Sequence, residues 1–172
     1  PLYTQSDAER SLRSFKAVSF GEEHRLADGV TFSMARSGHI LGSAFITISD
    51  GATKLVFSGD LGRADDPVMK TPAEIQDADY LVVESTYGDR LHRDSDPEAK
   101  LGRIIRETAA RGGTVVIPAF AVGRTQSILY HIFQLQQTGA IPDLPVFLDS
   151  PMAINVTKLM QRHQADHRLD PS

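Results

Sequence analysis

The residues best suited to chemistry follow predicted β-strands at the point where each strand ends. His39, Asp60 and Glu84 each lie in a short polar cluster after an apolar segment with the pattern of a strand. Those segments are residues 30–35, 54–57 and 80–83. If the strand ends lie along one edge of a sheet, a histidine and two carboxylates converge there, and such edges are common ligand sites in open α/β sheets.

His39 and Asp60 offer a nitrogen and an oxygen donor of the kinds that zinc accepts. A carboxylate can also bridge two metal ions, which suits a hydrolytic site that stabilises both the attacking and the leaving oxygen. Gly38, Gly42 and Gly59 would let the backbone pass close to such a site. On spacing alone the signal is weak, because a single histidine is more often structural and Ser-Gly-Asp occurs in many turns. A metal site and a pair of structural residues both stay open.

The elements that must position these side chains differ in predicted secondary structure between the two parts of the chain. Residues 1–92 are rich in hairpins and mostly β, with a further strand at residues 44–49 and a capping box at residues 6–9 that predicts a helix through Phe15. Residues 93–172 alternate between helices and strands. Helices are predicted to begin near Asp96, Gly123 and Pro151, and buried strands at residues 114–117 and 146–148. This order predicts an α/β arrangement with parallel strands, and we place the domain boundary near Leu91–Arg93.

Composition narrows the classes of protein. Hydrophobic residues make up 41% of the 172 residues and the formal net charge is −4, which predicts a globular chain without a strong electrostatic sign of a nucleic-acid partner. With no cysteine, any metal must be held by histidine and carboxylate, and the chain fits a reducing, cytoplasmic setting. No apolar run approaches the roughly 20 residues of a membrane span.

His163 and His167 are four apart, as in some metal pairs, but a solvated helix end is the favoured interpretation.

Five motifs resemble those of the β-CASP nucleases, which have the metallo-β-lactamase fold. Residues 37–44 are similar to the family's metal-binding His motif, residues 58–63 to its Asp motif, and residues 84–88 to the acidic motif that opens the β-CASP insertion. Residues 118–126 and 148–153 resemble two further signatures. The family includes the endonuclease subunit of the cleavage and polyadenylation specificity factor and, more distantly, ribonuclease J. The resemblance covers almost the whole chain, in the family's order.

The resemblance implies an α/β fold with two partial domains. Residues 1–92 would be part of a metallo-β-lactamase αββα sandwich, and residues 93–172 part of an inserted β-CASP α/β domain. The family's His-x-His-x-Asp-His motif and its two later histidines have no counterpart in residues 1–172. We therefore expect an excised central piece whose metal site is incomplete and which is inactive alone.

The resemblance also implies zinc-dependent hydrolysis of RNA phosphodiester bonds, at a site with two zinc ions between the domains. His39 and Asp60 would be metal ligands, with Asp60 bridging the two ions and so taking part in catalysis. Glu84 would orient one of the later histidines as a proton donor to the leaving group. The alternative for Glu84 is a strand-end carboxylate that caps a turn.

Two residues at predicted helix starts are candidates for substrate binding. Arg124 lies beside backbone N–H groups that are free to bind anions, so it could contact the RNA phosphate backbone. Pairing with a carboxylate at a domain interface is an equal alternative. Ser150, before Pro151, is first of all an N-cap, and a phosphate contact is the second interpretation. Arg63, Arg90 and Arg93 flank the predicted cleft, although surface salt bridges would explain them as well.

Other functions remain as alternatives. RNA is favoured over DNA because the motif from Glu84 to Gly88 looks like that of the RNA-processing branch, but a DNA nuclease of the same fold is open. A catalytically inactive scaffold subunit is a second alternative, although such relatives usually lose ligands. A small-molecule hydrolase of the superfamily is disfavoured by the motifs at residues 118–153. Expected partners are RNA, other RNA-processing proteins and a second copy of the parent protein in a homodimer, with no membrane.

Overall fold

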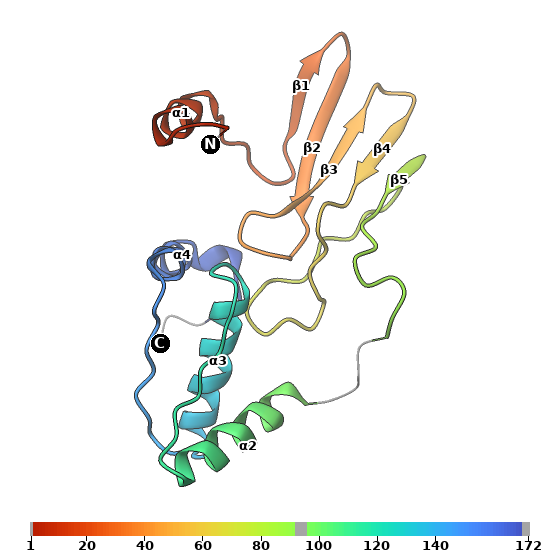
Figure 1. Cartoon of the computed structure of the whole chain (residues 1–172). Coiled ribbons are helices and arrows are strands. Elements are labelled where there is room, and N and C mark those ends of the chain that lie inside the picture. Colours follow the sequence, from red (N-terminus) through yellow and green to blue (C-terminus); the bar gives the residue numbers. More distant parts are fainter. Residues whose placement is uncertain (1, 92–95, 170–172) are drawn as a thin grey trace.

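The computed structural model describes residues 2–91 and 96–169, and it contains one five-stranded sheet (Figure 1). The strands are β1 (Glu23–Ala27), β2 (Val30–Arg36), β3 (Ala44–Ser49), β4 (Lys54–Phe57) and β5 (Tyr80–Val82). They lie in sequence order, antiparallel from β1 to β4, whereas β5 pairs with β4 in parallel. The strands predicted at residues 30–35, 44–49 and 54–57 are confirmed, and β1 was not predicted.

The N-terminal helix begins earlier than predicted. Helix α1 (Gln5–Ser11) continues into a 3-10 turn, η1 (Leu12–Ser14). Its capping box is formed by Thr4 and Asp7, because the Asp7 carboxylate accepts the Thr4 N–H at 2.9 Å and Thr4 Oγ1 accepts the Asp7 N–H at 3.3 Å. The predicted box at residues 6–9 is wrong, since Glu9 instead accepts a hydrogen bond from the Gln5 side chain at 2.9 Å.

The second half of the chain supplies three longer helices, α2 (Pro97–Ala110), α3 (Arg124–Gln137) and α4 (Pro151–Arg162), followed by the 3-10 turn η2 (Gln164–Asp166). Helices α2 and α4 begin as predicted, with Asp96 and Ser150 as N-caps and proline in the first turn. Helix α2 packs on α3 through Ile105 and Leu135. None of the helices in the described ranges is long and apolar enough to span a membrane.

The two buried strands predicted in this half are wrong. Residues 114–117 and 146–148 have no strand assignment and lie largely in solvent, with Val116 84% and Phe147 86% exposed. A strand requires a neighbour that completes its hydrogen-bond ladder, and no described segment pairs with either stretch. The apolar pattern therefore indicated segments that could form strands, but the described residues provide no strand for them to pair with.

The edge strand β5 differs from its prediction in burial. Its position is confirmed, but Tyr80 is 64% exposed and Leu81 59%, whereas Val56 on the neighbouring β4 is 1% exposed. The difference arises because β5 has a partner on one side only and nothing in the described ranges covers it. As for the predicted domain boundary, His92 and Arg93 lie outside the described residues, and the boundary stays a prediction.

The sheet meets the helices through an irregular segment, residues 61–73, which we call the bridging loop (Figure 1). Val68 and Met69 of this loop are 1% and 4% exposed and form a small core with Met160 of α4. Leu41, from the loop after β2, and Tyr130, from α3, pack against the same core. The mixed arrangement of one sheet and several helices agrees with the predicted α/β class.

Candidate metal centre

The order of the strands places the three predicted site residues at one edge of the sheet. Because β2 and β4 are both antiparallel to β3, they run in the same direction, and β5 is parallel to β4. The carboxyl ends of β2, β4 and β5 therefore lie at the same edge, as the strand-end argument requires. His39, Asp60 and Glu84 follow those three ends.

The side chains of His39 and Asp60 face each other across this edge. Nε2 of His39 lies 3.7 Å from Oδ2 of Asp60, and the side chains are 45% and 71% exposed. Zinc bonds to nitrogen and oxygen are each about 2.0–2.2 Å long, so one ion can contact both atoms across a gap below about 4.2 Å. The donor types and their separation therefore fit zinc. In the described ranges, no third histidine or carboxylate lies close enough to complete a ligand group.

A buried serine holds the two ligand-bearing loops together. Ser37, which is fully buried, donates its Oγ–H to the backbone oxygen of Asp60 at 2.9 Å and accepts the Gly62 N–H on its own backbone oxygen at 2.8 Å. Ser43 stabilises the loop that carries His39, because its Oγ accepts the His39 N–H at 3.1 Å. Sequence reasoning quoted both serines as part of a motif and gave neither a role. Ser37 is buried and Ser43 is half-buried, and the spacing of residues in the sequence indicates neither.

Two glycines allow the loops to approach each other. A Cβ atom at Gly62 would lie 2.0 Å from the backbone oxygen of Gly38, a distance that no side chain can occupy. Gly38 itself has a φ of +73°, and a Cβ there would lie 2.7 Å from the backbone oxygen of Lys70. The expectation that glycine lets the backbone pass closely is confirmed at Gly38 and holds at Gly59, where a Cβ would lie 3.3 Å from the Ala44 oxygen. It is wrong at Gly42, which has open space around it, and Gly62 is a further position that the sequence did not indicate.

Glu84 is tied to the backbone on both of its carboxylate oxygens. Oε1 accepts the Leu61 N–H at 3.3 Å, and Oε2 accepts the Thr86 N–H at 2.9 Å. Hydrogen bonds from the side chain and backbone of Thr86, then from Leu61, hold the pKa of Glu84 below its ordinary value, and the charge of His39 acts in the same direction. Glu84 is therefore an ionised acceptor beside the His39–Asp60 pair.

Helix α3 begins next to the His39 loop. A Cβ at Gly123, the N-cap of α3, would lie 3.2 Å from the Ile40 side chain. Arg124 follows at the first helical position with its side chain exposed, and the described residues give its guanidinium no hydrogen bond or ion pair. The expectation of free N–H groups beside Arg124 is wrong in part. The amides of Gly123, Arg124 and Thr125 already donate to Gln126, Val122 and Phe120.

Ser150 acts as a helix cap in this structure. Its Oγ accepts the Ala153 N–H at 3.2 Å, which confirms the N-cap interpretation. A phosphate contact by Ser150 stays a prediction. Of the flanking arginines, Arg63 pairs with Asp65 at 2.9 Å and Arg90 with Asp89 at 2.8 Å, which are ordinary surface salt bridges. Arg93 lies outside the described residues.

The two histidines near the end of the chain do not share a helix face. Helix α4 ends at Arg162, so His163 is its C-cap and His167 lies beyond it. His167 is 6% exposed, and its Nδ1 accepts the Leu169 N–H at 3.1 Å, which leaves Nε2 to donate to the Met160 backbone oxygen at 2.9 Å. For His167 the solvated helix end was the wrong interpretation, because both ring nitrogens are engaged in the interior.

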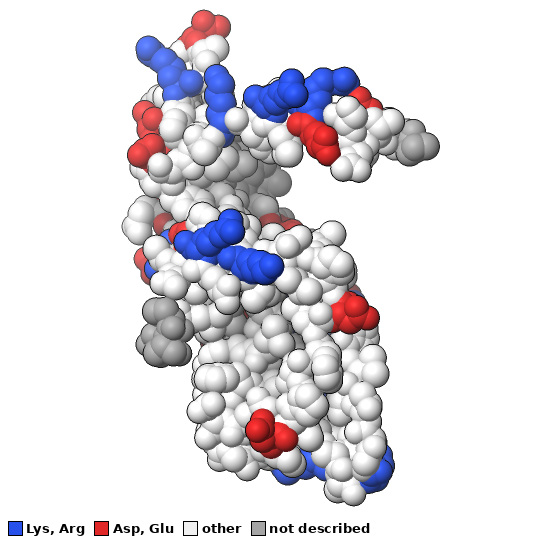
Figure 2. Space-filling model, turned by 90° about the vertical axis from the view of Figure 1, so that its left-hand side faces the viewer, with Lys and Arg blue, Asp and Glu red and all other residues white. Residues whose placement is uncertain are grey.

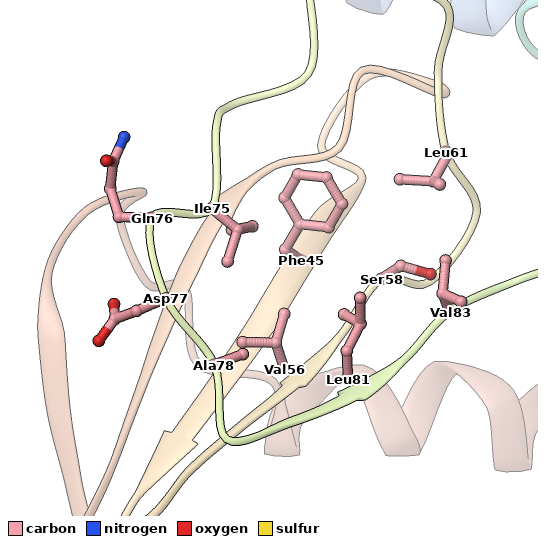
Figure 3. Close-up of a pocket in the computed structure, with 10 residues that line it drawn as sticks. All are labelled: Phe45, Val56, Ser58, Leu61, Ile75, Gln76, Asp77, Ala78, Leu81 and Val83. Atoms are coloured by element: carbon pink, nitrogen blue, oxygen red, sulfur yellow. The ribbon is translucent and has the colours of Figure 1, made fainter.

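An apolar pocket of about 380 Å³ lies on the sheet near this edge (Figure 3). The side chains of Phe45, Val56 and Leu81 gather around it, whereas those of Gln76 and Asp77 point away. Because its lining is largely apolar, the pocket offers packing surface and no catalytic groups. We therefore assign the chemistry of this edge to the loops above it.

Charge is spread unevenly over the surface. On the face shown in Figure 2, Lys and Arg side chains gather in the upper part of the view and in a small group at mid-height, while the lower part is mostly uncharged. This face therefore has no continuous basic track. Contacts to a polyanion would depend on individual cations rather than on a broad patch.

The carboxyl ends of three strands that run in the same direction bring together a histidine and an aspartate, and helices are attached to this sheet through a loop. This is the arrangement that the resemblance to proteins of the metallo-β-lactamase fold implies. The comparisons with known proteins are more specific. The family described as the Beta-Casp domain matches residues 125–172. Ribonuclease TTHA0252 of Thermus thermophilus is 36% identical over 163 residues, which cover 94% of this chain and 37% of that protein.

Two further relatives come from other domains of life. The RNase J-like protein of Methanocaldococcus jannaschii is 31% identical over 156 residues, covering 87% of this chain and 37% of that protein. Cleavage and polyadenylation specificity factor 73 of Drosophila melanogaster is 31% identical over 155 residues, covering 88% of this chain and 22% of that protein. The chain thus spans between about a fifth and two fifths of the length of these relatives. It belongs to the β-CASP family of the metallo-β-lactamase fold.

Proposed function

We propose that this chain forms the central part of a zinc-dependent nuclease that hydrolyses RNA phosphodiester bonds at a two-metal site between the metallo-β-lactamase and β-CASP domains. The observation that carries the proposal is the 3.7 Å approach of His39 Nε2 to Asp60 Oδ2 at the carboxyl edge of the sheet. The proposal is supported by relatives whose names are those of ribonucleases. A lone surface His–Asp pair would contribute little to stability, so its maintenance by a buried serine favours a functional role.

In this proposal the chain itself contributes two metal ligands and one orienting carboxylate. His39 offers a ring nitrogen and Asp60 offers two carboxylate oxygens, one of which is free to reach a second ion. When bound, zinc would neutralise developing charge on the phosphate and lower the pKa of the attacking water. Ser37 and Gly62 keep the two ligand loops in register, so that the ligands are held in place before a metal arrives.

Glu84 would hold a proton donor in place. Each of its carboxylate oxygens accepts one backbone N–H, which leaves lone pairs for a further donor. An ionised carboxylate at that position favours a protonated, correctly oriented histidine, which the full-length protein would supply as in the family's pattern. The histidine would then give its proton to the leaving oxygen of the cleaved RNA strand.

The substrate side of the proposal rests on Arg124. Arg124 is exposed at the start of α3, directly after Gly123, which lies against Ile40 of the loop that carries His39. A phosphate bound near the metal site would therefore be close to the start of α3. Ser150 would be a second, weaker contact. We also propose other RNA-processing proteins as partners, a homodimer of the full-length protein, and a cytoplasmic location.

The test uses the full-length protein that contains residues 1–172. Its zinc content is measured by metal analysis, and its cleavage of RNA and DNA strands of matched sequence is measured side by side, with and without a chelator. Zinc-dependent cleavage that prefers RNA is the expected result. Preference for DNA would point to a DNA nuclease of the same fold, and RNA binding without zinc or cleavage would point to a scaffold subunit.

A further inference from the structure

The bridging loop (residues 61–73) is attached on one side to the loops that carry the proposed metal ligands. Its first residues follow Asp60 directly, and the Gly62 N–H donates to Ser37 at 2.8 Å. Further along, the backbone oxygen of Lys70 lies against Gly38, and the Ala73 N–H donates to the Arg36 oxygen at 2.8 Å. The bridging loop therefore begins next to Asp60 and contacts the backbone on the N-terminal side of His39.

The opposite side of the bridging loop is held by the segment Gln164–Leu169, which we call the C-terminal hook. The Arg168 N–H donates to the Val68 oxygen at 2.8 Å, and Met69 pairs with His167 in an isolated antiparallel bridge. The Lys70 ammonium also donates to the Ala165 oxygen. The hook thus adds backbone pairing to a loop that has no regular secondary structure of its own.

The Arg168 side chain contacts three separate points of the bridging loop. Nη1 donates to the Asp66 oxygen at 3.1 Å, and Nη2 donates to the Ala64 oxygen at 3.2 Å and to Thr71 Oγ1. A planar guanidinium can serve several acceptors at once, which a lysine ammonium on a flexible stem does poorly. Arg168 therefore fixes the two halves of the loop relative to each other.

The hook is itself anchored in the interior. His167 is buried with both ring nitrogens engaged, one by the Met160 oxygen of α4 and one by the Leu169 N–H. Met160 packs in the same core as Val68 and Met69. The bridging loop is therefore held in place by contacts to α4 as well as by contacts to the loops of the sheet.

We propose that Arg168 is a positioning residue for the metal centre: through the bridging loop it sets the separation of His39 and Asp60, and so links the β-CASP region to the geometry of the site. This inference rests on the proposed zinc-dependent function. Residues that orient metal ligands without touching the metal typically change metal affinity or activity about tenfold to a hundredfold when they are removed. Arg168 acts one step further away, and we expect about a tenfold effect.

The experiment compares three variants of the full-length protein with the wild type. Arg168→Ala removes all three side-chain contacts, and Arg168→Lys keeps the charge without the fork. Arg103→Ala is the matched control, because Arg103 is an exposed arginine of α2 whose ion pair within the described ranges is to Glu107 of its own helix. Zinc affinity is measured by competition with a chelator, loop stability by amide hydrogen exchange over residues 61–73, and cleavage by kcat and KM separately.

We expect Arg168→Ala to weaken zinc binding about tenfold, to speed exchange in the bridging loop, and to lower kcat while KM for RNA stays within about twofold. Arg168→Lys should give zinc affinity, exchange and kcat values between those of Arg168→Ala and the wild type. Arg103→Ala should match the wild type in all three. A zinc-loaded, active wild type with an Arg168→Ala variant of equal zinc affinity and equal exchange would overturn this inference alone. A wild type that neither holds zinc nor cleaves RNA would overturn the proposed function, and the inference with it.

Discussion

Leu61 donates its backbone N–H to Oε1 of Glu84 at 3.3 Å, which ties the residue after Asp60 to the end of β5. The contact joins two sequence motifs that lie 23 positions apart in the chain. It places an ionised carboxylate beside the proposed ligands, yet outside any metal-binding group of the described residues. The roles of Asp60 and Glu84 can therefore be separated by experiment.

Asp60→Asn in the full-length protein should abolish cleavage and lower the zinc content. The amide keeps the shape of the side chain but loses the charge that a bridging ligand needs. The control is Asp77→Asn, since Asp77 is an exposed aspartate that pairs with Lys54 at 2.8 Å away from the site. Metal analysis and an RNA cleavage assay make the measurement, and normal activity with full zinc in Asp60→Asn would remove Asp60 from the site.

Glu84→Gln should cut kcat by about a hundredfold, the scale of a general acid–base contribution, while zinc stays bound. The variant keeps the shape of the side chain but has no charge to support a protonated histidine, and one of its two acceptor oxygens becomes an amide donor. Steady-state kinetics and metal analysis on the same preparation provide the measurement. If zinc is lost together with activity, Glu84 is a ligand and the orienting role is wrong.

The Glu84 carboxyl should titrate below the ordinary glutamate pKa of 4.5, because Thr86 and Leu61 donate hydrogen bonds to its charged form. A folded-state pKa below the unfolded value means that the ionised group stabilises the fold above pH 4.5 and loses that contribution as pH falls through the lowered pKa. Carbon-13 NMR of the carboxyl carbon measures the midpoint. A midpoint at or above the ordinary value would show that these hydrogen bonds do not form in solution.

Arg124→Ala should weaken RNA binding more than it slows the chemical step. Loss of one phosphate contact should flatten the slope of log affinity against log salt by roughly 0.7 for a single strand. Binding is measured across a salt series, with Arg103→Ala as the reference for loss of a surface charge. An unchanged slope would favour pairing of Arg124 with a carboxylate elsewhere in the full-length protein.

Residues 1–172 as a separate polypeptide should bind zinc poorly and hydrolyse no RNA. His39 and Asp60 are two donors, whereas catalytic zinc usually has about three protein ligands plus water. Exposed apolar side chains such as Leu81 and Phe147 should also make the isolated chain prone to aggregation. Metal analysis and a ribonuclease assay on the purified chain test this, and stoichiometric zinc with robust cleavage would show that other residues complete the site.

The sequence by itself determined the features that depend on short-range interactions. The alternation of residues in β2 and β3, the proline-containing helix starts at Pro97 and Pro151, and the Ser150 cap each involve contacts within a few positions. The sequence also indicated that the candidate ligands follow strand ends, but only as a condition that these ends lie at one edge of a sheet. The pairing of β2, β4 and β5 in the structure met that condition.

Only the tertiary structure decided what depends on distant partners. His39 and Asp60 lie 3.7 Å apart on loops that are joined by the hydrogen bonds of Ser37 and by the close approach of Gly62 to Gly38, contacts that spacing alone could not place. His167 is buried because it pairs with Met69, which is far away in the chain, and because its ring hydrogen-bonds to the Met160 oxygen of the nearby α4. Residues 114–117 and 146–148 failed as strands for the same reason, because β-structure forms only where a second segment completes its hydrogen bonds.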